Sequence, residues 1–143
     1  MIRFYLSHKI RGNKGDDATL EEMERNLQMA IKAGQEMKAY FLDWERMEGF
    51  PKVDLYVPAE HDEVLSFIYH KGWITIKQLL EADCALLEKC DLLIVLGTQI
   101  SKGMKVEIDY AQTHNIPIYM IGYVDKDTMG ALKDIYKKVI LEN

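Results

Sequence analysis

The sequence lacks the marks of several large protein classes. No apolar run approaches the roughly 20 residues that a membrane-spanning helix needs, and the first residues, Met1–Ser7, are too few and too polar for a signal peptide. The formal net charge is −5, whereas proteins that bind a phosphate backbone usually present a basic surface. We therefore expect a cytoplasmic protein without a membrane or nucleic-acid polymer as partner. One small anionic ligand remains compatible with this charge.

Metal-binding and cofactor motifs are also scarce. The only cysteines, Cys84 and Cys90, are six residues apart, which fits no zinc or CxxC spacing and predicts two buried thiols. The acidic run Glu60–Glu63 contains a histidine, but adjacent helical residues point in different directions. No Walker A motif, GxGxxG motif or Ser-His-Asp set is present. We predict no metal site and no cofactor.

The remaining sequence is that of one ordinary globular domain, residues 1–143, with 48% apolar and 29% charged residues. Hydrophobic periodicity predicts strands and helices in alternation. The predicted strands are Ile2–Ser7, Val53–Val57, Leu92–Leu96 and Ile116–Ile121, and the predicted helices are Leu20 to about Ala39, Glu60–Tyr69, Ile74–Cys90, Gly103–His114 and Asp127–Leu141. This order predicts an α/β doubly wound, flavodoxin- or Rossmann-like fold: a parallel sheet of four to five strands with helices on both faces.

In such a fold the first strand lies between the second and the third, and ligands bind beyond the carboxyl ends of the strands at that switch point. Two loops should meet there, residues 8–12 and 97–101. Ser101 is a candidate N-cap, and the helix start at Ser101–Gly103 is a potential anion site. Glu107 follows about one and a half turns later. On spacing alone, a solvated surface glutamate is the simpler interpretation of Glu107.

Other candidate residues border the same crevice. Asp83 adjoins Cys84 on the apolar side of its predicted helix, and Arg11 is a natural counter-charge for an anionic ligand. His8 follows the first strand and can reach the crevice. Tyr5 lies inside that strand, where a core tyrosine with a satisfied hydroxyl is the alternative interpretation.

Three segments together resemble the nucleoside 2-deoxyribosyltransferase superfamily, and by motif the 2'-deoxynucleoside 5'-phosphate N-hydrolases. The first is the strand and IRG loop, Phe4–Gly12. The second runs from Asp83 to Asp91, with an acid eight residues before the aspartate that precedes the third strand. The third, Thr98–Ala111, is similar to the family's serine, glycine and glutamate pattern without a gap. The resemblance covers the first strand and about residues 76–121.

This resemblance implies cleavage of an N-glycosidic bond in a small-molecule nucleotide or nucleoside, by hydrolysis or deoxyribosyl transfer. Glu107 would act at C1' of the sugar, Tyr5 would orient it, and Asp83 would bind the sugar or assist the departing base. If Asp83 supplies that proton, its pKa should be the higher of the two acids. The 5'-phosphate would be held by the helix start and the IRG loop; its candidate residues are Ser101, Gly103, Arg11, Gly12, Ile10 and His8. The resemblance also implies a homodimer or larger homo-oligomer.

Two alternatives stay open. The opening segment Phe4–His8 is also similar to TIR domains, some of which cleave NAD, and incubation with NAD distinguishes this activity. A non-catalytic protein with the same pocket would sequester a nucleotide. Tight retention of nucleotide without release of free base would indicate that role.

Overall fold

The computed structural model describes residues 1–10 and 18–142 of the chain. Strands and helices alternate along the chain, as the hydrophobic periodicity predicts. The elements are β1 (Ile2–Ser7), α1 (Leu20–Glu48), β2 (Val53–Tyr56), the 3₁₀ helix η2 (Pro58–His61), α2 (Asp62–His70), α3 (Ile76–Leu87), β3 (Leu92–Leu96), α4 (Lys102–Thr113), β4 (Ile118–Ile121), α5 (Lys126–Ile135) and the π-helical η3 (Tyr136–Leu141).

The described strands form one parallel sheet in the order β2-β1-β3-β4. Tyr5 of β1 is therefore flanked by Tyr56 of β2 on one side and by Leu93 of β3 on the other. The chain order reverses between β1 and β3, which confirms the predicted doubly wound arrangement and its switch point.

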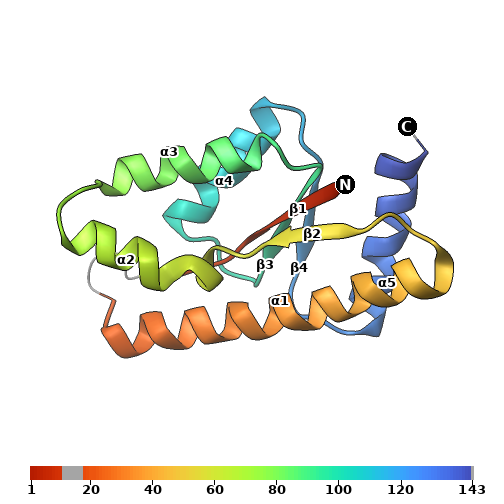
Figure 1. Cartoon of the computed structure of the whole chain (residues 1–143), viewed down its shortest axis with the longest axis horizontal. Helices are drawn as coiled ribbons and strands as arrows, with labels where there is room; N and C mark the ends of the chain where they lie inside the picture. The colour runs from red at the N-terminus through yellow and green to blue at the C-terminus, as the bar shows by residue number, and fades with distance from the viewer. Residues whose placement is uncertain (11–17, 143) are drawn as a thin grey trace.

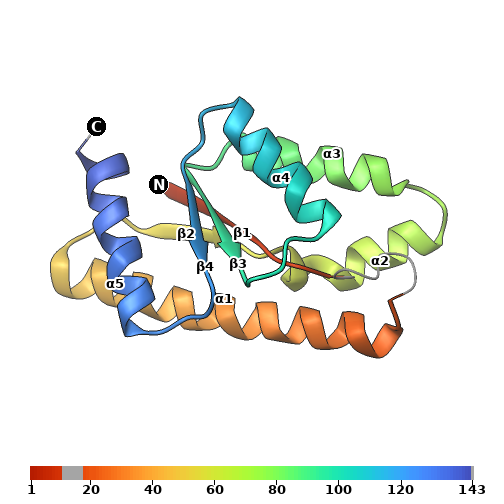
Figure 2. The same cartoon turned by 180° about the vertical axis from the view of Figure 1, so that it is seen from behind.

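Helices cover both faces of this sheet (Figures 1 and 2). Helices α1 and α5 pack on one face and α3 and α4 on the other, while the connection from α2 to α3 projects beyond the carboxyl ends of the strands. Strand β1 supplies both cores because successive side chains point to opposite faces. Phe4 and Leu6 join the core under α1 and α5, and Tyr5 joins the core under α3 and α4.

Helix α1 is longer than the periodicity predicts. The sequence suggested an end near Ala39, but the helix continues to Glu48. Phe41 and Trp44 continue the buried stripe beyond Met37, so packing favours helix past the predicted end. Gly49 then ends it in the left-handed conformation, with φ of 70°. Thr19 caps the other end, since its hydroxyl accepts from the Glu22 N–H.

Smaller differences concern other boundaries and the thiols. The predicted terminal helix divides into α5 and η3, and the predicted helix Glu60–Tyr69 divides into η2 and α2. Cys84 is buried as expected, whereas Cys90 is only half-buried. Within the described ranges, no helix combines the length and apolarity needed to cross a membrane.

Candidate functional site

Glu107 lies inside the protein rather than on its surface. On α4 it shares the buried stripe with Met104 and Ala111, which are separated from it by three and four residues. Only 6% of Glu107 is exposed. The solvated interpretation of Glu107 is therefore wrong, and the helix directs a carboxyl group against the sheet.

Strand β1 provides the groups that meet this carboxyl. The Ser7 hydroxyl donates a hydrogen bond of 2.9 Å to Oε1 of Glu107. Tyr5, two residues earlier, faces the same side of the sheet, and both side chains are completely buried. The Tyr5 hydroxyl has no hydrogen-bond partner of good geometry among the described residues, although it is close enough to lower the pKa of Glu107. A buried hydroxyl without a partner is unusual in folded proteins, and here the charged group that acts on it most strongly is Glu107.

Asp83 approaches the same carboxyl from α3. Its helix begins at the capping box formed by Thr75 and Gln78, and it packs against the sheet through Cys84 and Leu87. Asp83 is half-buried next to this apolar stripe. Its negative charge raises the pKa of Glu107, Tyr5 and Tyr56, so the acid lies near all three. Three elements that are far apart in the sequence therefore converge on one acidic cluster: Tyr5, Ser7, Asp83 and Glu107.

Burial makes both acids of this cluster hold their protons more tightly. It raises the pKa of Asp83 to about 6. It raises the pKa of Glu107 to about 7, with a further increase from Asp83 and a partial decrease from Tyr5 and Ser7. The Glu107 pKa is the higher of the two, opposite to the order expected for a proton-donating Asp83, because Glu107 is the more deeply buried. The proton of such a close pair belongs to both acids together.

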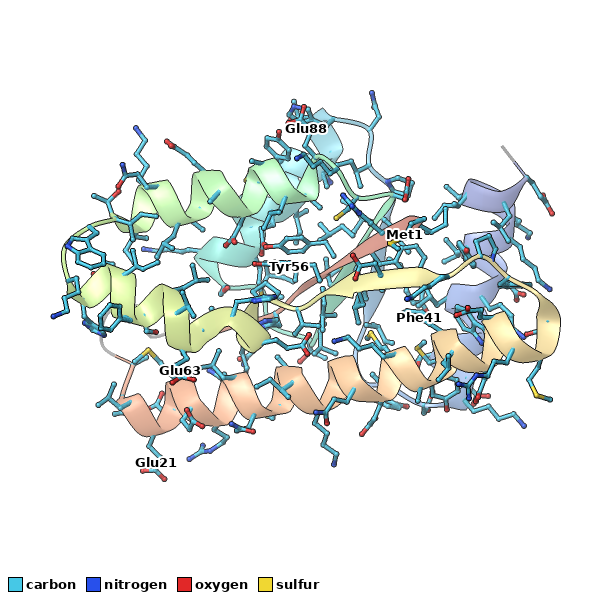
Figure 3. All side chains as sticks on the ribbon, in the orientation of Figure 1. Met1, Glu21, Phe41, Tyr56, Glu63 and Glu88 are labelled. Atoms are coloured by element: carbon cyan, nitrogen blue, oxygen red, sulfur yellow. The ribbon has the colours of Figure 1, made fainter. Side chains whose placement is uncertain are left out.

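Tyr56 is a part of the site that sequence reasoning missed. It ends β2 beside Tyr5, with the two ring centroids 5.3 Å apart, and its ring stacks on His61 at 5.0 Å. In Figure 3 it lies near the centre of the molecule, between β2 and the helix pair α3 and α4. Burial, Asp83 and Glu107 raise its pKa to about 12. The predicted strand order places β2 beside β1, and alternation puts Ser7 on the face of Tyr5, but the register that pairs Tyr56 with Tyr5 comes from the structure.

The predicted phosphate-binding residues divide into three groups. Ser101 caps α4, accepting from the Met104 N–H at 3.3 Å, and Gly103 lies in the first turn, so the expected helix start is present. Arg11 and Gly12 lie outside the described residues. His8 and Ile10 engage other parts of the protein.

His8 connects β1 to η2. The Ala59 N–H donates to Nε2 at 3.1 Å, so the neutral ring carries its proton on Nδ1 and donates it to the Lys9 carbonyl. Burial lowers the pKa of His8, which favours this neutral form. The carbonyl of Ile10 accepts from the Asn26 side chain at 2.7 Å, and the Ile10 side chain packs on the larger core. Both ring nitrogens of His8 therefore take part in hydrogen bonds within the protein.

Comparison with known protein families adds one match. Residues 76–121 match the model of a domain of unknown function, DUF7768. This segment runs from α3 to β4 and contains Asp83, Ser101 and Glu107. No curated protein and no solved structure matches the chain. In the described ranges, no group of three or more histidine, cysteine, aspartate or glutamate side chains is arranged to hold a metal ion.

Proposed function

We propose that this protein cleaves the N-glycosidic bond of a nucleotide or nucleoside, with Glu107 acting at C1' of the sugar. The observation that supports the proposal is the convergence of two acids with raised pKa values on two buried hydroxyl groups, those of Tyr5 and Ser7. Keeping two acids partly desolvated disfavours their charged forms. Perturbed acids of this kind are concentrated at functional sites.

The reaction requires one ionised and one protonated carboxyl group. As the bond from C1' to the base breaks, positive charge develops on the sugar, and ionised Glu107 stabilises or captures it. The departing base takes up a proton, which Asp83 supplies from the form of the singly protonated pair that carries the proton on Asp83 and the charge on Glu107. Water then adds to C1', its hydroxide forming the new bond and its proton returning to the acid pair. An acceptor base in place of water gives transfer instead of hydrolysis. Tyr5 and Ser7 orient Glu107.

The α4 start supplies a complementary anion site. The backbone N–H groups of the first helical turn and the positive end of the helix dipole favour a phosphate near Ser101 and Gly103. By the family resemblance, Arg11 would be its counter-charge. The proposal therefore favours a 5'-monophosphate as substrate. We further propose a cytoplasmic homodimer or larger homo-oligomer. Two free cysteines fit a reducing compartment, and exposed Phe67 and Trp73 offer apolar surface for a second subunit.

A panel of deoxynucleoside and ribonucleoside 5'-monophosphates, the free nucleosides and NAD tests this function, with released base measured by mass spectrometry. Adding an acceptor base separates hydrolysis from transfer. Glu107→Gln should lower turnover on the order of a thousandfold, because the sugar loses its charge partner. Asp109→Asn is the matched control, since Asp109 is an exposed acid of the same helix. If the protein retains nucleotide without releasing base, it is a sequestering protein rather than an enzyme. Activity confined to NAD would indicate the TIR-like alternative.

The same assay predicts a pH dependence. The active form carries one proton on the acid pair, so kcat/KM should be greatest between about pH 6 and 7. It should fall at lower pH, where both acids are protonated, and at higher pH, where both are ionised. Asp83→Asn should remove the alkaline decrease for substrates whose base leaves without help. If Asp83→Asn leaves the pH profile of kcat/KM unchanged, Asp83 does not take part in the reaction.

A further inference from the structure

A cavity lies on the opposite face of the sheet from Glu107. It has a volume of about 420 Å³ and is bounded by α1 and by the carboxyl ends of β1, β3 and β4. In Figure 2 the chain leaves β4 beside α1 before it enters α5. Of the described residues that line the cavity, none belongs to the cluster of Tyr5, Ser7, Asp83 and Glu107. The two sites share only the edge of the sheet at the switch point.

Small residues create this space. Ala30 and Ala33, one turn apart on α1, form part of the wall, and Gly97 and Gly122 follow β3 and β4. A Cβ atom added at either glycine would meet no atom within 4 Å. Leu96 and Val124 complete an apolar interior. The volume falls in the range of about 300–1,000 Å³ typical of small-molecule sites.

The charges at the cavity favour an anion. Lys9 and Lys32 both line it, and neither forms an ion pair within the part of the chain that the structure describes. Glu36 is the acidic residue among the described lining residues, and His8 is engaged by Lys9 and Ala59, so within the described lining positive charge exceeds negative charge by one. This local excess occurs in a chain of net charge −5. Asn26 adds a polar side chain next to the apolar wall.

We propose that this cavity is a second binding site, separate from the acidic cluster, for a small organic anion with a flat apolar body. The body would lie against Ala30, Ala33 and Leu96, where desolvation is favourable. The anionic group, a carboxylate, sulfonate or phosphate, would lie between Lys9 and Lys32. This site does not depend on whether the protein cleaves nucleotides.

Two fluorescent probes of almost the same shape test the site. One is 8-anilinonaphthalene-1-sulfonate, which is anionic, and the other is N-phenyl-1-naphthylamine, which lacks the sulfonate. Both are titrated into the full chain, and backbone amide NMR shifts locate the bound probe. We expect one saturable site that perturbs the amides of Gly97, Gly122 and Val124. Perturbation confined to Phe67 and Trp73, the exposed aromatic residues of the α2–α3 region, would overturn the proposal.

Variants separate charge from shape. The double variant Lys9→Gln/Lys32→Gln should weaken the sulfonate probe about tenfold and leave the neutral probe unchanged, since each partly exposed ion pair contributes modestly. Gly122→Leu should fill the cavity and weaken both probes, and Ala33→Leu is a second variant with the same expected effect. Gly130→Leu is the matched control, because Gly130 lies on α5 and also has open space at its Cβ position. Equal affinity of the sulfonate probe for wild type and the double lysine variant would refute the anion site.

Discussion

The two faces of the sheet have different chemistry although they share the same strands. Among the described residues, the hydrophobic cluster under α1 and α5 has sixteen buried members, and buried His8 lies on the same side. The cluster under α3 and α4 has six, and Ser7 and Glu107 are buried on that side. The larger face holds most of the apolar packing, and the smaller face buries a carboxyl group. This division teaches that a small domain can hold a destabilising acidic cluster when its other face is well packed.

Aromatic contacts explain the strength of the larger face. Phe41 packs edge-on against Phe4 at 5.4 Å and against Trp44 at 5.2 Å, and Trp44 stacks on Tyr136 at 6.3 Å. Edge-to-face pairs add to the free energy gained by burying apolar area. These rings come from β1, α1 and η3, so one cluster joins the two ends of the chain to its longest helix.

The largest expected effect on stability is therefore at Phe41. Phe41→Ala should lower the free energy of unfolding by about 3–5 kcal/mol, because it removes a buried ring and leaves a cavity. Urea denaturation followed by circular dichroism measures this loss. Leu42→Ala is the neighbouring control, since Leu42 is 41% exposed. Similar losses in the two variants would show that the aromatic cluster does not dominate the stability of this face.

The next effect is expected on the other face and has the opposite sign. Burial raises the pKa of Glu107 from 4.5 to about 7, so folding favours its protonated form. The contribution of the Glu107 proton to the free energy of unfolding is fully present below about pH 4.5 and is lost as pH rises through about 7. The total loss is about 3 kcal/mol at most. Glu107→Gln should therefore raise the free energy of unfolding at pH 8 and change it little at pH 5.

Urea denaturation at the two pH values tests this sign. The control is Asp109→Asn, which should stay within about 0.5 kcal/mol at both, because Asp109 is exposed. A Glu107→Gln protein that is less stable than wild type at pH 8 would mean that the Ser7 hydrogen bond outweighs the unfavourable burial of the carboxylate. In that case the face under α3 and α4 would not be destabilised by its buried carboxyl group.

The sequence predicts the sheet better than it predicts the site. Parallel order, the switch point and the Ser101 cap follow from alternation and local capping signals, which depend on neighbours in the chain. The predicted end of α1 was wrong although local signals for the longer helix exist, namely the helical spacing of Met37, Phe41 and Trp44 and the terminal Gly49. The burial of Glu107 was missed on spacing alone for a different reason. It depends on how α4 lies against Ser7, which is a hundred residues away in the chain.

The smallest effect compares two tyrosines, one on each face. The hydroxyls of Tyr5 and Tyr136 are both buried without a hydrogen-bond partner among the described residues. Because an unpaired buried hydroxyl is unfavourable, Tyr136→Phe should raise the free energy of unfolding by about 1 kcal/mol, and Tyr5→Phe should raise it less because the Tyr5 hydroxyl interacts with Glu107. Denaturation is measured at pH 5, where Glu107 is mainly protonated, so that its negative charge does not affect the comparison.

Activity is expected to separate the same pair. Tyr136 packs against Phe4, Trp44 and Phe50, far from any acid of the cluster, so Tyr136→Phe should turn over substrate as wild type does. Tyr5 lowers the pKa of Glu107, which is the higher of the pair, so Tyr5→Phe should raise that pKa and move the alkaline limb of the kcat/KM profile to higher pH. A profile that is unchanged in Tyr5→Phe would make Tyr5 a core residue like Tyr136. In that case the two faces would differ only through Glu107, Ser7 and Asp83.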